Sequence, residues 1–310
     1  TGGPPGGRGA YITFVQGEEY LMYAAVLLKS MHELGHAHPN VLMLREDSPL
    51  AARAPGILAA MRRAGWNADI EVFRPKEIRG KSGGLPTWIE CWQRIALFSL
   101  DPARYGRFVH LDGDMLVLRN LDSLLNGTSP APQFARRQGM CRKLSDVHTS
   151  TPVTNLFVAR PDMDIYRWLD GFLEERMGEA SVLPDEAQAI PEAYRALRRP
   201  APELLGQEHL FYYNCFPNLF PPGRGSDAQF HQINPALPHG IRVLHFGGKG
   251  QVNLKSMLAA RTPLFQAAEA DLKGQHFLAS AFRRWYQLYE SSDVQRVIAA
   301  GRGPAPPSHL

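Results

Sequence analysis

The chain has 310 residues, 44% of them hydrophobic and 21% charged, so it is long enough and apolar enough to bury a sizeable core in one large domain. Its formal net charge is +4, with the basic residues scattered along the sequence. This argues against a nucleic-acid-binding protein and suits a small anionic ligand such as a nucleoside diphosphate. No apolar run approaches the roughly 18 residues of a transmembrane helix, so no membrane span is expected.

Strands alternate with helices along the chain, which predicts an α/β fold with a mostly parallel sheet covered on both faces. Apolar runs predict strands at residues 10–15, 40–44, 69–73, 107–111, 115–118, 155–158 and 241–246. Helical spacing of apolar residues predicts helices at 20–34, 57–64, 87–100 and 162–175, and a surface helix with charged flanks at 184–200. The Gly/Pro-rich ends, 1–9 and 301–310, are expected to be disordered tails around a single domain at 10–300.

Features that bear on the cellular compartment point in two directions. Cys91, Cys141 and Cys215 are too few and too odd in number for a disulfide framework, which favours a reducing compartment such as the cytoplasm. The glycosylation sequon at Asn126 favours the alternative of a Golgi or endoplasmic reticulum lumen. The sequence starts at Thr1 without a methionine and looks trimmed, which is compatible with a removed anchor or signal.

Two carboxylates, Asp112 and Asp114, flank Gly113 directly after the predicted strand 107–111. Ligands of open α/β sheets bind at the carboxyl ends of strands. Mn²⁺ and Mg²⁺ prefer such oxygen ligands, and a nucleoside diphosphate supplies the remaining oxygens. The alternative is a turn in which Asp and Gly provide only backbone geometry, and for an isolated Asp-x-Asp that alternative is favoured about four to one.

A second candidate is the segment His-Phe-Gly-Gly-Lys-Gly that begins at His245. The predicted strand before it places His245 at a strand end, and the two following glycines allow the backbone to approach a ligand closely. A neutral imidazole suits manganese, and Lys249 is able to neutralise phosphate charge. A hairpin turn with a solvated lysine is an equally good account of this segment on its own.

Taken in this order, the chain resembles glycosyltransferase family 8, the group of retaining sugar transferases that includes glycogenin and galactinol synthase. The likeness runs from about residue 10 to 255 and is centred on 107–125, where the sequence looks like the family's Asp-x-Asp segment almost throughout. The segment at His245 falls where the family has its late His-Phe-x-Gly signature.

The resemblance implies a Rossmann-like domain of the GT-A type, with a nucleotide-binding half at 10–125 and an acceptor half at 126–300. It further implies a UDP-sugar donor and Mn²⁺, with Mg²⁺ as the alternative ion. Carried over by position, the metal ligands are Asp112, Asp114 and His245. The nucleotide-sugar site is then formed by Thr13, Phe14, Val15, Gln16, Tyr20, Arg79, Asp112, Gly113, Asp114, Thr154, Asn155, Gly248 and Lys249.

The resemblance assigns catalytic roles to Gln207, Glu208 and Lys249. The chain departs from the family at two places. Trp88 stands where the family has a lysine, and Gln207-Glu208 stands where the family has Asp-Gln. The acceptor is expected to be a hydroxyl of a saccharide, a polyol or a protein, and self-glycosylation at Tyr212 or Tyr213 stays open, as does a homodimer. The alternative function is an inactive relative that binds a nucleotide sugar or a glycan without turnover.

Overall fold

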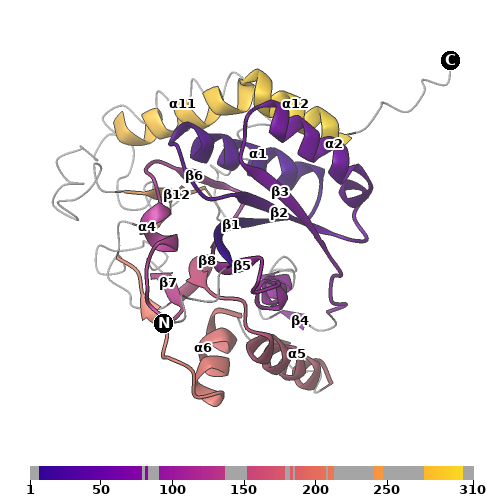
Figure 1. The fold of residues 1–310 in the computed structure, drawn as a ribbon, viewed down its shortest axis with the longest axis vertical. Coiled ribbons are helices and arrows are strands. Elements are labelled where there is room, and N and C mark those ends of the chain that lie inside the picture. The colour runs from indigo at the N-terminus through magenta and orange to yellow at the C-terminus, as the bar shows by residue number, and fades with distance from the viewer. Residues whose placement is uncertain are drawn as a thin grey trace.

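A seven-stranded sheet forms the centre of the protein in the computed structural model (Figure 1). The structure describes residues 7–78, 81–82, 91–136, 152–178, 182–183, 186–206, 209–212, 241–246 and 276–302. In sheet order, the strands are β10 (Glu203–Leu204), β7 (Gln133–Arg136), β8 (Pro152–Ala159), β5 (Tyr105–Leu111), β1 (Arg8–Val15), β2 (Asn40–Arg45) and β3 (Ala68–Phe73). Within this sheet β8 runs against the other strands, so the predicted mostly parallel α/β sheet is confirmed.

Helices cover both faces of this sheet (Figure 1). One face carries α1 (Glu18–Glu33), α2 (Pro49–Arg63), α11 (His276–Glu290) and α12 (Ser292–Arg302). The other carries the 3₁₀ helix η1 (Trp92–Ser99), α5 (Met163–Gly178) and α6 (Glu186–Ala196). Successive residues of β1 serve the two faces in turn: Tyr11 and Val15 pack in the first core, and Ala10 and Ile12 in the second. Burial on both faces explains why β1 reads as a continuous apolar run.

A smaller sheet brings the late part of the chain to the end of β5. Its strands are β11 (Phe211–Tyr212), β12 (Val243–His245) and β6 (Met115–Val117), in that order. β12 runs antiparallel to β6 with His245 opposite Met115. Two further short elements are the strand pair of β4 (Lys81–Ser82) with β9 (Val182–Leu183), and the helix α4 (Asp122–Leu125). The pairing of β12 with β6 places His245 next to Asp114.

The predicted strands are all present, with ends that differ by at most three residues. The helix predicted at 57–64 starts earlier, at Pro49, because Ser48 caps it: the Ser48 hydroxyl accepts a hydrogen bond from the Leu50 amide. The described part of the helix predicted at 87–100 is the tighter 3₁₀ helix η1.

The surface helix predicted at 184–200 is present, with one face exposed and the other buried. The structure places α6 at Glu186–Ala196, and its inner face is buried against the second core through Ala189, Ile190 and Ala193. Among the residues that the structure describes, none of the helices combines the length and apolar character that crossing a membrane requires.

Candidate metal centre

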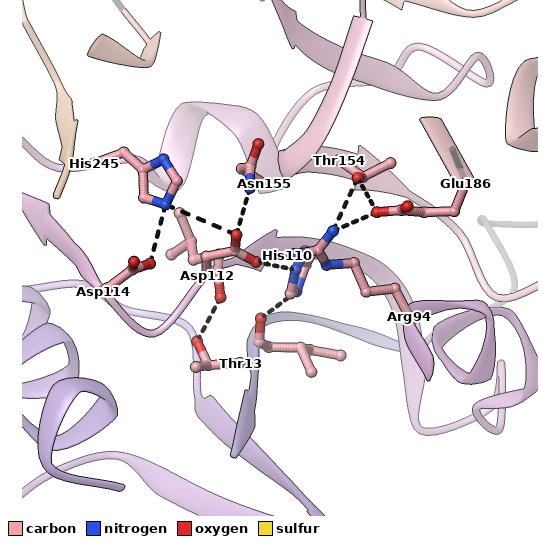
Figure 2. Close-up of polar contacts among 11 residues, drawn as sticks. Thr13, Arg94, His110, Asp112, Asp114, Thr154, Asn155, Glu186 and His245 are labelled. Carbon is pink, nitrogen blue, oxygen red and sulfur yellow. Dashed lines mark hydrogen bonds and ion pairs between the residues drawn. The ribbon is translucent and has the colours of Figure 1, made fainter. Parts of the chain in front are cut away.

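Two carboxylates and an imidazole converge at the carboxyl end of β5 (Figure 2). Asp112 follows β5, Asp114 precedes β6, and His245 is the last residue of β12. His245 Nε2 lies 3.0 Å from Asp114 Oδ1 and 3.8 Å from Asp112 Oδ2. One ligand atom from each residue lies within 4.8 Å of the other two. The structure therefore brings together the three residues predicted as metal ligands.

The chemistry of this group fits a divalent cation. Two carboxylate oxygens with one imidazole nitrogen form the mixed oxygen and nitrogen set that suits Mn²⁺. The side chain of His245 is 7% exposed, whereas that of Asp114 is 29% exposed, so the group is open on the Asp114 side. An ion held here would keep coordination positions for oxygens of a ligand that arrives from that side.

The orientation of Asp112 is fixed by protein contacts on both carboxylate oxygens. Arg94 Nη2 donates to Oδ1 at 2.7 Å, and His110 Nε2 lies 3.2 Å from the same oxygen. Asn155 Nδ2 donates to Oδ2, and the Asp112 amide donates to the Asn155 carbonyl at 3.0 Å. These contacts use three of the roughly four acceptor positions of a carboxylate, which leaves one on Oδ2 for a cation.

Charge at the centre is set by these same neighbours. Burial alone would raise the pKa of Asp112, but the charge of Arg94 and the contact with His110 outweigh it, so the pKa of Asp112 lies well below its usual range. Burial alone would lower the pKa of His245, but the negative charges of Asp114 and Asp112 raise it above the ordinary value. Asp112 is therefore ionised at neutral pH, and a cation that binds His245 would displace the proton of its imidazole.

A buried polar network lies behind Asp112 (Figure 2). Arg94 Nη1 donates to Thr154 Oγ1 at 3.1 Å and to Glu186 Oε1, and the Thr154 hydroxyl donates to the same Glu186 oxygen at 2.6 Å. Burial alone would lower the pKa of Arg94. The negative charges around it, with Asp112 the largest contributor, outweigh burial and raise the pKa well above its ordinary value. A permanently charged Arg94 thus joins η1, β8 and α6 to the candidate metal centre.

Sequence reasoning did not identify Arg94, His110 and Glu186. Arg94 is a cation within the apolar helix predicted at 87–100, and a buried charge requires a partner, which was an available signal. His110 stands two residues before Asp112 on a strand, so both side chains lie on the same side of the sheet. This spacing was a second available signal. No feature of the sequence indicated that Glu186 is buried.

The predicted nucleotide-contacting residues of β1 divide between the two faces of the sheet. The Thr13 hydroxyl, buried, donates to the Leu111 carbonyl at 3.0 Å and so ties β1 to β5. Val15 is 1% exposed, so any contact with a nucleotide there falls to its backbone. Phe14 is half-buried and packs edge-on against Phe73, with ring centroids 5.2 Å apart.

Tyr20 and Gln16 lie nearer the surface. Gln16 is half-buried, and the Tyr20 ring is 39% exposed at the start of α1. Burial raises the pKa of Tyr20, and the charge of Asp114 raises it further. A Cβ atom built on Gly113 would lie 3.8 Å from the Tyr20 carbonyl oxygen, so the start of α1 lies beside the turn that carries Asp114. The structure therefore brings Tyr20 towards Asp114 as an exposed aromatic surface.

Of the other predicted residues, Thr154 and Asn155 lie on β8 and contact the Asp112 network directly. Five predicted site residues and Trp88 lie outside the described residues: Arg79, Trp88, Gln207, Glu208, Gly248 and Lys249.

Comparison with known proteins gives a short match in sequence. No protein-family model matches the chain. A curated protein of Gibberella zeae named Glucose N-acetyltransferase 1 is 29% identical over 122 residues, which is 38% of this chain. The match spans 26% of that protein, about a quarter of its length.

Solved structures match over most of the chain. The galactosyltransferase LgtC, in complex with donor and acceptor sugar analogues, aligns over 87% of this chain and 95% of its own, with 17% identity and a TM-score of 0.50. The glycosyltransferase GlyE of Streptococcus pneumoniae aligns over 94% and 63%, with 12% identity and a TM-score of 0.52. The bifunctional glycosyltransferase WbbM aligns over 79% and 46%, with 13% identity and a TM-score of 0.52. The fold is thus the GT-A fold of these glycosyltransferases.

Proposed function

We propose that the protein is a retaining glycosyltransferase that moves a hexose from a UDP-sugar to a hydroxyl acceptor with the help of Mn²⁺. The observation that carries this proposal is the meeting of Asp112, Asp114 and His245, one ligand atom from each within 4.8 Å of the others, at the carboxyl edge of a GT-A sheet. In open α/β sheets this edge is where ligands bind. Mg²⁺ is the alternative ion.

A divalent ion held by Asp112, Asp114 and His245 would supply positive charge to a diphosphate leaving group. The protein contributes orientation: Arg94 and Asn155 hold the two oxygens of Asp112, and the backbone amide of Phe246 donates to the Asp114 carbonyl at 3.0 Å. Groups fixed before reaction need no reorganisation as charge develops. In a retaining transfer the leaving phosphate oxygen takes the acceptor proton, so the proposal requires no separate general base.

The catalytic roles of Gln207, Glu208 and Lys249 remain part of this proposal. Lys249 would add positive charge at the diphosphate, and Gln207 or Glu208 would steady the sugar centre as it loses the leaving group. The acceptor is a hydroxyl of a saccharide, a polyol or a protein.

The name of the curated relative suggests a second candidate, the transfer of an acetyl group to a sugar. The metal-ligand group favours glycosyl transfer over this candidate. A diphosphate gains negative charge at the bond that breaks, and a divalent ion stabilises that charge directly. The reacting bond of an acetyl thioester carries no such phosphate charge.

A donor panel tests the proposal. UDP-glucose, UDP-galactose, UDP-N-acetylglucosamine and acetyl coenzyme A are each incubated with the protein, with Mn²⁺ or with a chelator. Released UDP and the mass of acceptor products are then measured. We expect UDP release from one UDP-sugar with Mn²⁺, and its loss with the chelator and in Asp114→Asn.

The other outcomes separate the alternatives. Acetylated product without UDP release would support the second candidate. UDP binding without turnover of any donor would identify an inactive relative. The absence of both binding and turnover for every UDP-sugar would refute the proposed function.

A further inference from the structure

A second buried carboxylate lies behind the metal centre, at the start of α6. Glu186 is 4% exposed, and its Oε1 accepts hydrogen bonds from both Arg94 Nη1 and the Thr154 hydroxyl. The other amino group of Arg94, Nη2, donates to Asp112 Oδ1 at 2.7 Å. One guanidinium group therefore lies between two carboxylates that come from distant parts of the chain.

Arg94 is shared between two carboxylates. Its one positive charge faces the negative charges of both Asp112 and Glu186. Because Arg94 also pairs with Glu186, it neutralises the charge of Asp112 only in part. The negative charge of Asp112 therefore persists on the side that faces Asp114 and His245. At low solvent exposure such charges interact strongly, because water screens them little.

The geometry of Arg94 gives Glu186 a second effect. An arginine and a carboxylate favour the pairing in which two N–H groups meet both oxygens. Here Nη1 is held by Glu186 and Thr154, so only Nη2 reaches Asp112. Asp112 Oδ2 then stays directed to Asn155 and to the side of His245, whose Nε2 lies 3.8 Å away.

We propose that Glu186 is a positioning residue for the metal centre: by holding one amino group of Arg94, it keeps Asp112 Oδ2 directed to the side of His245 and available to a divalent cation. The inference rests on the metal site of the proposed function. Glu186 itself touches neither the cation site nor, in this account, the reacting atoms, and it acts through Arg94.

The test is a titration of the protein with Mn²⁺ alone, in which electron paramagnetic resonance measures the free ion. Glu186→Gln keeps the shape of the side chain and its acceptor oxygen but removes the charge. We expect the Kd for Mn²⁺ to rise about tenfold, measured at a temperature where circular dichroism shows the variant folded, because loss of a buried ion pair also lowers the Tm. The matched control is Asp170→Asn, which also removes one carboxylate charge from an ion pair, with Lys76, away from the centre; its Kd is expected to stay within about twofold of wild type.

A second variant protects the test against misfolding. Thr154→Val removes the hydroxyl that contacts both Arg94 and Glu186, and we expect a Kd rise of a few fold. A Glu186→Gln protein that folds and binds Mn²⁺ as well as the control does would overturn the positioning role alone. Should Glu186→Gln fail to fold, a wild-type Kd in Thr154→Val would overturn it instead. Absence of Mn²⁺ binding in the wild type would overturn the metal centre itself, and with it this inference.

Discussion

The two aspartates that flank Gly113 are held in different ways. Asp112 has both carboxylate oxygens engaged by Arg94, His110 and Asn155, whereas Asp114 has its described carboxylate contact with His245 and is more exposed. A carboxylate with fixed oxygens offers a cation one defined direction. The more exposed one is able to adjust to the ligand. In the proposed metal centre, Asp112 would set the geometry and Asp114 would adapt to the ligand.

The glycine between the two aspartates is not required by the backbone. A Cβ atom built on Gly113 would lie 3.6 Å or more from its neighbours, which is ordinary contact, and its φ is not in the left-handed region. Gly106 on β5 is the opposite case, because a Cβ there would lie 2.3 Å from the Gly7 carbonyl oxygen. We expect Gly113→Ala to change the free energy of unfolding by less than about 0.5 kcal/mol, and Gly106→Ala to lower it by about 1–3 kcal/mol.

Urea denaturation of both variants measures this difference, and Mn²⁺ titration of Gly113→Ala shows whether the centre is retained. A Gly113→Ala protein as unstable as Gly106→Ala would mean that the turn needs glycine after all.

The residues of the centre were predictable to different extents. Asp112 and Asp114 follow a strongly apolar strand, and His245 ends another, so their place at strand ends follows from the sequence. Their meeting depends on the pairing of β12 with β6, which local pattern does not specify. Arg94 and Glu186 meet because α6 packs on β8 and η1 contacts the same strand through Phe98 and Phe157, and no spacing in the sequence records that contact.

At the scale of elements, a buried histidine joins the end of α1 to the segment that precedes α4. His36 Nδ1 lies 2.8 Å from the Met31 carbonyl, and Nε2 accepts a hydrogen bond from the Leu121 amide at 3.0 Å. A ring that accepts at Nε2 and donates at Nδ1 is neutral. Burial lowers the pKa of His36 below its ordinary value, although its contact with Met31 and the charge of Asp122 act in the opposite direction.

This lowered pKa predicts a pH-dependent stability. Between the depressed pKa of folded His36 and its unfolded value of about 6.5, the unfolded chain binds more protons, so the free energy of unfolding falls as the pH drops below about 6.5. We expect the loss between about pH 7.5 and pH 5.5 to be smaller in His36→Gln, which does not titrate. Urea denaturation at both pH values gives the comparison.

The other histidines are the same in wild type and variant, so their contributions cancel in the difference between the two proteins. An equal loss in the two proteins would show that His36 does not cause the effect.

The elements themselves were largely predictable. Buried strands appear as short apolar runs, and their length separates them from helices. The start of α2 was missed although Ser48 and Pro49 are a recognised pair of helix-start signals. The helix continues through Pro55 and Gly56, two residue types that usually mark a break. The 3₁₀ form of η1 has no distinct sequence pattern.

At the scale of the whole molecule, the last described segment returns to the first. α12 packs on α2 and α1, and Lys29 Nζ lies 2.9 Å from Asp293 Oδ2. The division into a nucleotide-binding half and an acceptor half is therefore not a division into separate cores, since residues 276–302 lie on the same face as α1. The α/β class follows from alternating elements, but this return is a tertiary contact that the sequence pattern does not record.

Trp285 connects the C-terminal helices to the candidate metal centre. Its ring, fully buried on α11, lies 6.5 Å between centroids from Phe246, the residue that follows His245, and 6.3 Å from Tyr23 on α1. We expect Trp285→Ala to lower the free energy of unfolding by about 3–5 kcal/mol and also to weaken Mn²⁺ binding, because Phe246 loses the surface that holds the end of β12.

The matched control is Leu169→Ala, which opens a cavity in the core on the other face of the sheet. It should cost about 2–5 kcal/mol without changing the Kd for Mn²⁺. Both variants are titrated with Mn²⁺ at a temperature where circular dichroism shows them folded, so that global unfolding does not enter the comparison. If the two variants bind Mn²⁺ equally well, the C-terminal helices stabilise the fold without positioning His245. The two variants disturb opposite faces of the sheet. A weaker affinity in Trp285→Ala alone would therefore show that α11 supports the metal-binding residues.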